Sequence, residues 1–147
     1  MEDAQAGQIL TFLLDTNVLS ELRKVTPHGA VLAWYKNHSA TAFAVPALAL
    51  YEIQAGAEVT RRQDAEKASE IERWAEALAK DAVVLPLDGV SARESARLMA
   101  RQSRLLIEDA MIAAIAKVNG LIVATRNTRD FERFAVPLVN PFLYPKG

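Results

Sequence analysis

Cysteine is absent from the 147 residues of this chain. Disulfides, thiolate metal sites and cysteine nucleophiles are therefore excluded, and a reducing cytoplasm is the natural setting. The sequence also lacks a glycine-rich phosphate-binding loop, which excludes nucleotide-dependent enzymes of that kind. It has no apolar run long enough to cross a bilayer, and its first residues lack the basic start of a signal peptide. We therefore expect a cytoplasmic protein without membrane attachment.

The chain also has little net charge and few histidines. The formal net charge of -1 argues against a protein that coats nucleic acid, although it allows a local basic rim around an acidic pocket. His28 and His38 have no catalytic Ser or Asp pattern around them, so we assign them no catalytic role. With 51% hydrophobic and 24% charged residues the chain is globular. We expect residues 1–11 to form a flexible extension and residues 12–147 a single domain.

Short apolar runs alternate with helical patterns along the chain. Buried strands are predicted at residues 11–14, 42–45, 83–85 and 121–124, and a short edge strand at residues 136–139. Residues 110–116 are apolar on every side, which is typical of a buried helix. Other helices are expected to begin at caps, with Thr16 or Asn17 capping one and Thr26 and Pro27 starting the next. This alternation predicts an α/β fold with a short, mainly parallel sheet of four to five strands, covered by helices on both faces.

Four carboxylates fall at matching places in this pattern. Asp15 follows the first strand, and Asp130 follows the fourth. Glu52 lies in the helix after the second strand, and Asp109 opens the buried helix. The carboxyl ends of parallel strands meet at one edge of a sheet, so these acids are expected to converge there. Each acid also has a purely structural explanation, as a cap, a solvated charge or a turn former.

Acids that converge near a core repel one another, and divalent cations would relieve this repulsion. Mg²⁺ or Mn²⁺ suits oxygen ligands, and two such ions can activate a water for displacement at a phosphodiester. Thr125 and Asn127 are placed to orient a water or a carboxylate. Candidate phosphate contacts are the cations beside these motifs, namely Arg23, Lys24, Arg126 and Arg129. Trp34, Tyr35 and Trp74 are candidates for stacking on bases, but their helical spacing favours packing in the core or a dimer.

Four segments of the chain resemble, in their order along it, the motifs of PIN-domain ribonucleases, and more closely those of VapC-type toxins. They are residues 15–21 (DTNVLSE), 51–56 (YEIQAG), 108–114 (EDAMIAA) and 125–131 (TRNTRDF), with Asn140 and Pro141 beyond them. The resemblance implies a three-layer α/β/α PIN-like domain. It also implies an endoribonuclease that uses Mg²⁺ or Mn²⁺ and cuts tRNA or another structured RNA. The metal-site acids of the family map onto Asp15, Glu52, Asp109 and Asp130, and accessory polar positions onto Asn17, Thr125 and Asn127.

The resemblance also implies partners. It predicts a homodimer and a small VapB-like antitoxin that occupies the active-site groove and binds promoter DNA. The sequence departs from the family at Pro46, where a serine is common, and at Glu108, which precedes Asp109 where a small or apolar residue is usual. Glu108 therefore becomes a further candidate for the acidic site.

Two alternatives remain open at this stage. One is a catalytically silent PIN-like module that binds a DNA-binding partner, against which the presence of all four acids argues. The other is a phosphatase with Asp15 as the nucleophile. Such enzymes usually carry a second Asp two residues on, where this chain has Asn17.

Overall fold

The structure is a computed structural model that describes residues 9–146, so residues 1–8 of the predicted extension lie outside the described residues. Its strands are β1 (Phe12–Leu14), β2 (Phe43–Pro46), β3 (Val83–Leu85), β4 (Ile122–Ala124) and β5 (Leu138–Val139). Its helices are α2 (Thr16–Arg23), α3 (Gly29–Lys36), α4 (Ala47–Arg61), α5 (Ala65–Asp81), α6 (Gly89–Met99), α7 (Ile107–Asn119) and α8 (Thr128–Glu132). Short 3-10 turns are η1 (Ala40–Ala42), η2 (Arg104–Leu106) and η3 (Pro141–Leu143).

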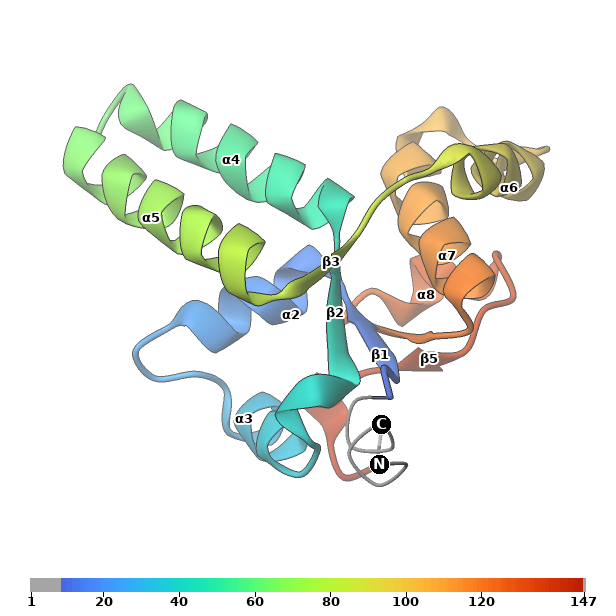
Figure 1. Cartoon of the computed structure of the whole chain (residues 1–147), viewed down its shortest axis with the longest axis horizontal. Helices are drawn as coiled ribbons and strands as arrows, with labels where there is room; N and C mark the ends of the chain where they lie inside the picture. The colour runs from blue at the N-terminus through green and yellow to red at the C-terminus, as the bar shows by residue number, and fades with distance from the viewer. Residues whose placement is uncertain (1–8, 147) are drawn as a thin grey trace.

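The strands form one parallel sheet in the order β3-β2-β1-β4-β5, with β1 at its centre (Figure 1). Leu13 of β1 pairs with Ala44 of β2 on one side and with Val123 of β4 on the other. Thr11 extends this pairing, because its N–H donates to the carbonyl of Ala42 at 2.8 Å. The predicted edge strand is β5, which pairs with β4. The prediction of a short parallel sheet is confirmed.

Side chains of the central strands alternate between two cores, as the period of two in a strand requires. On one face, Leu13 packs with the buried residues of α7 and with Phe131. On the other face, Phe12 and Leu14 pack with residues of α2, α3 and α4, including the buried Trp34. Helices therefore cover both faces of the sheet, which gives the predicted three-layer architecture. The helix at residues 110–116 is buried as predicted.

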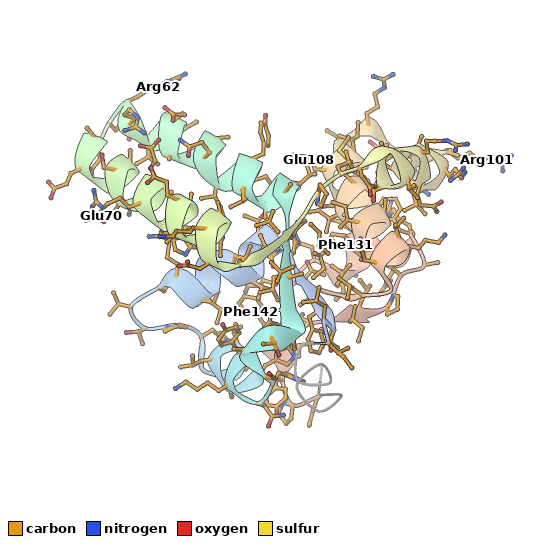
Figure 2. The ribbon with its side chains drawn as sticks, in the orientation of Figure 1. Arg62, Glu70, Arg101, Glu108, Phe131 and Phe142 are labelled. Carbon is orange, nitrogen blue, oxygen red and sulfur yellow. The ribbon has the colours of Figure 1, made fainter. Side chains whose placement is uncertain are left out.

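Two pairs of helices, α4 with α5 and α6 with α7, diverge from the carboxyl edge of the sheet (Figure 1). Helix α4 starts immediately after β2, and Arg62 marks the outer tip of its pair (Figure 2). Helix α7 precedes β4, so in a crossover between parallel strands it runs back toward their amino ends. The first turns of α4 and α7 therefore both lie at the carboxyl edge of the sheet.

The predicted start of α3 is wrong. We expected Thr26 and Pro27 to begin this helix, but its N-cap is His28, whose Nδ1 accepts a hydrogen bond from the N–H of Ala30 at 3.2 Å. The N–H of His28 in turn donates to Glu21 Oε2 at 2.8 Å. This contact to α2 places the start of α3 at His28.

Within residues 9–146, no helix combines the length and the apolar character that a membrane crossing requires.

Candidate active site

Asp15 is the last extended residue before α2, and its carboxylate is held by three hydrogen bonds. Its Oδ1 accepts from the N–H of Thr16 at 2.8 Å, so Asp15 is the N-cap of α2. Its Oδ2 accepts from Thr125 Oγ1 at 2.7 Å and from Asn17 Nδ2 at 3.1 Å. The prediction that Thr16 or Asn17 is the cap is therefore wrong. Asp15 is only 4% exposed, so these bonds fix a nearly buried carboxylate in one orientation.

Asn17 and Thr125 connect the ends of the two central strands β1 and β4. The hydroxyl of Thr125, which is fully buried, also accepts from the N–H of Asn127 at 3.0 Å. Asn17 Oδ1 accepts from the N–H of Arg126 at 3.1 Å. Two of the three predicted accessory residues, Asn17 and Thr125, therefore contact Asp15 directly. The third, Asn127, joins the network through its backbone and is exposed. This network holds the loop after β4 against the loop after β1.

Glu52 reaches the same edge of the sheet from the second turn of α4. Its Oε1 accepts a hydrogen bond from Thr16 Oγ1 at 2.7 Å. Sequence reasoning missed this role of Thr16, which it considered only as a cap. Partial burial raises the pKa of Glu52, and the negative charges of Glu108 and Asp15 add to this rise. Thr16 therefore links the two acids, because its backbone N–H donates to Asp15 and its hydroxyl donates to Glu52.

Asp109 lies in the first turn of α7 and is the carboxyl most affected by its neighbours. Its pKa is raised to about 6, first by loss of solvation and then by the negative charges of Asp15, Asp130, Glu52 and Glu108. Burial also raises the pKa of Asp15, although its hydrogen bonds oppose that shift. Asp15, Glu52 and Asp130 thus all lie within electrostatic reach of Asp109.

Glu108 is a fifth acid of this group. Its charge raises the pKa of both Glu52 and Asp109, and Figure 2 shows it on the side of the α6–α7 pair that faces α4. The departure from the family pattern at this position therefore adds negative charge at the site.

The chemistry of this donor set fits a hard divalent cation. All five side chains offer carboxylate oxygens, and none of them forms a salt bridge with Lys or Arg within residues 9–146. In that same part of the chain, no three acids or histidines are arranged closely enough to enclose an ion by themselves. Mg²⁺ commonly takes one or two protein carboxylates and several waters, so an open arrangement of this kind is compatible with a hydrated ion.

The four candidate cations differ in their surroundings. Lys24 is paired with Glu21 at 2.9 Å. The guanidinium of Arg23 lies over the ring of Trp74, 5.3 Å from its centroid, and that of Arg126 lies over Phe142 at 4.6 Å. Arg129 is exposed in α8.

The three aromatic candidates also differ in their burial and their contacts. Trp34 is 2% exposed in the core, and Tyr35 stacks on Phe43 with ring centroids 4.7 Å apart. Trp74 is partly buried against the same core and also lines two cavities, one beside α2, α3 and α5 and the other beside α2, α4 and α5. The interpretation as packing residues is therefore confirmed for Trp34, and Tyr35 and Trp74 also pack against the core.

Comparisons with known proteins agree with this fold. Residues 12–137 match the PIN domain. VapC ribonuclease Y4jK of Sinorhizobium fredii is 35% identical over 135 residues, covering 88% of this chain and 96% of that protein. The FitAcB structure from Neisseria gonorrhoeae has a TM-score of 0.75 at 26% identity, covering 90% of this chain and 99% of that one. A toxin-antitoxin complex from Klebsiella pneumoniae has a TM-score of 0.68 at 25% identity, covering 89% and 98%. The chain therefore belongs to the PIN domain family and, within it, to the VapC type.

Proposed function

We propose that this protein is a metal-dependent endoribonuclease, the toxin of a type II toxin–antitoxin pair, which hydrolyses phosphodiester bonds in tRNA or another structured RNA. One observation carries the proposal: the charges of Asp15, Glu52 and Asp130 all act on Asp109, and no cationic side chain within residues 9–146 neutralises them by an ion pair. A cluster of this kind is costly unless a cation joins it. The ribonuclease name of its VapC relative supports the same activity.

In this proposal Asp15, Glu52, Asp109 and Asp130 would hold hydrated Mg²⁺ or Mn²⁺, one or two of them directly and the others through water bound to the ion. The bound ion supplies a water of lowered pKa and neutralises charge on the reacting phosphate. Asp15 is held in one orientation by Thr125, Asn17 and the N–H of Thr16, so little reorganisation is needed when the ion binds. Thr16 orients Glu52 in the same way. Glu108 adds negative charge that strengthens attraction for the cation.

Among the proposed cationic contacts, Arg126 directly follows Thr125, which hydrogen-bonds to Asp15. Arg126 is held through its backbone by Asn17 and through its guanidinium by Phe142, so its side chain loses little freedom when it meets a phosphate. Arg23, Lys24 and Arg129 complete the set that we propose for phosphate contacts.

The direct test is cleavage of purified total RNA by the purified chain. We expect cleavage with Mg²⁺ or Mn²⁺, its loss when EDTA removes the metal, and its return when metal is added in excess. Sequencing of the RNA ends identifies the cleaved bond and the RNA class. Retention of full activity in EDTA, with the same cleavage sites, would contradict the metal-dependent mechanism.

We also propose that an antitoxin places apolar side chains in a large cavity on the sheet face covered by α2, α3 and α5. Its volume is about 820 Å³, and residues of its mainly apolar wall include Leu22, Leu32, Tyr35 and Leu78. The known toxin-antitoxin complex of the same fold supports a partner of this kind. Such a partner is encoded beside the toxin in the pair that we propose, and it binds the promoter DNA of that pair.

Leu32→Glu is expected to weaken the complex with the product of the neighbouring reading frame at least about ten-fold, because it places a charge in an apolar wall. Ala33→Glu is the matched control, since Ala33 is exposed on the same helix. Size-exclusion chromatography with light scattering measures the complex, and the mass of the free toxin tests the proposed homodimer. Equal binding by both variants would place the antitoxin elsewhere.

A further inference from the structure

Gly56 lies in the interior of α4 (Ala47–Arg61), where its own backbone conformation and close neighbours do not require a glycine. Glycine destabilises a helix interior relative to alanine, so its presence calls for an explanation. The backbone at Gly56 is not left-handed, and a Cβ added there would meet nothing within 4 Å. Neither conformation nor close packing therefore requires glycine. Gly56 lies one helical turn after Glu52 on the same side of α4, so the missing side chain leaves open the space beside Glu52.

This space is a cavity of about 200 Å³ between α2, α4 and α5. Glu52 and Thr16, which are hydrogen-bonded to each other, form the wall toward the acidic cluster. The rest of the wall includes Ser20, Arg23, Gly56, Thr60 and Trp74. The cavity therefore opens directly beside the candidate active site.

The wall combines a flat aromatic and cationic surface with free hydroxyl groups. Arg23 and Trp74 are stacked with the guanidinium 5.3 Å from the ring centroid. Arg23 has no carboxylate partner among the ion pairs of residues 9–146. The hydroxyls of Ser20 and Thr60 form no side-chain hydrogen bonds with other described residues. Aromatic rings and arginine planes bind unpaired bases by stacking, and hydroxyls bind base edges.

We infer that this cavity binds one unpaired nucleobase of the RNA, adjacent to the phosphodiester that lies at the acids. This inference rests on the proposed ribonuclease function and adds a specificity subsite to it. The volume suits one base, whereas an α-helix of a partner, about 10 Å across with its side chains, needs the larger neighbouring cavity. Gly56 keeps the cavity open, and Trp74 provides the stacking surface. RNA with an unpaired nucleotide at the cleavage site is therefore the expected substrate class.

Filling the cavity tests the inference without disturbing the acids or the core. In an Asp109→Asn background, which prevents cleavage, binding of fluorescent single-stranded A8, C8, G8 and U8 oligoribonucleotides is measured by anisotropy. Gly56→Leu is expected to weaken binding of the best of these at least about ten-fold, because the added side chain takes the place of the base. Gly29→Leu is the matched control, since an added Cβ is equally unhindered there and Gly29 does not line the cavity.

Two further readouts separate a base subsite from a general loss of structure. The melting temperature of Gly56→Leu is expected to equal or exceed that of its parent, because leucine is the better helix former. An oligonucleotide that lacks bases is expected to bind this variant and its parent equally weakly. If Gly56→Leu binds all four oligonucleotides as its parent does, or if the parent binds none of them, the subsite is overturned. Metal-dependent cleavage by the wild type would then leave the proposed function intact, whereas absence of cleavage would overturn that function as well.

Discussion

Asp109→Asn is expected to reduce RNA cleavage at least about a hundred-fold while leaving the fold intact. Asp109 is the carboxyl on which the charges of Asp15, Glu52, Glu108 and Asp130 all act, so it occupies the centre of the electrostatic cluster. An amide keeps its size but loses the charge that attracts a cation. Cleavage is measured with Mn²⁺ and Mg²⁺ on the same RNA. Glu70→Gln is the matched control, because Glu70 is exposed on α5, away from the acids (Figure 2).

The same substitution is expected to stabilise the metal-free protein at neutral pH. The folded pKa of Asp109 is about 6, above its ordinary value of 3.8, so the folded state binds this proton more tightly than the unfolded state. The wild type therefore loses stability as pH rises from about 4 to about 6, and the variant lacks that loss. After allowance for the partial exposure of Asp109, we expect a gain of about 1 kcal/mol at pH 7.5, or roughly 2–4 °C in melting temperature.

Thermal unfolding in EDTA at several pH values measures this difference. The gain is expected to become small near pH 3.5, where most of the wild-type carboxyl is protonated in both states. A variant that cleaves RNA normally would refute the catalytic proposal. A variant that is less stable than the wild type at pH 7.5 would show that Asp109 makes a favourable interaction in place of the repulsion inferred from its neighbours.

Thr125→Val is expected to lower the free energy of unfolding by about 2–3 kcal/mol and cleavage by roughly 10- to 100-fold. Valine has nearly the same shape, but it removes the hydroxyl that donates to Asp15 Oδ2 and accepts from the N–H of Asn127. Because Asp15 is 4% exposed, water cannot readily replace the lost donor. The expected fall in melting temperature is about 4–12 °C.

Thr125→Ser is the control for this second variant. It keeps the hydroxyl, so both hydrogen bonds can form again, and its activity is expected to recover most of the way to the wild type. Chemical denaturation gives the stability of each variant, and cleavage of the same RNA gives its activity. If valine lowered stability and cleavage no more than serine does, the hydroxyl of Thr125 would not have the role proposed for it.

Local patterns in the sequence were sufficient to predict the sheet and the places of the acids. A strand that is buried on both faces must be apolar throughout, so β1, β2 and β4 are visible as short apolar runs. Asp15 and Asp130 were predicted near the same edge because each follows such a run, and parallel strands place their carboxyl ends together. Their catalytic roles stay predictions until variants are measured.

Patterns within one segment failed where the deciding contact came from another segment. The start of α3 depends on Glu21 of α2, which accepts from the N–H of His28, and nothing around Thr26 and Pro27 reveals that contact. Likewise, Trp34 and Trp74 both occur at helical spacing. Only the packing of α3 and α5 on the sheet determines that Trp34 is buried in the core, whereas Trp74 is partly buried against that core and also lines cavities beside α2.

By itself, the sequence determined the succession of strands along the chain, the buried helix at residues 110–116 and the positions where acids follow the apolar runs. These properties depend on neighbouring residues and on the periods of strand and helix. The short helix α8 was not predicted. Only the tertiary structure decided that Thr16 joins Asp15 to Glu52, that Glu108 adds its charge to Asp109, and that Gly56 leaves a cavity beside Glu52. These relations depend on distances between segments far apart in the chain. Such distances are fixed when the two hydrophobic cores pack against the sheet.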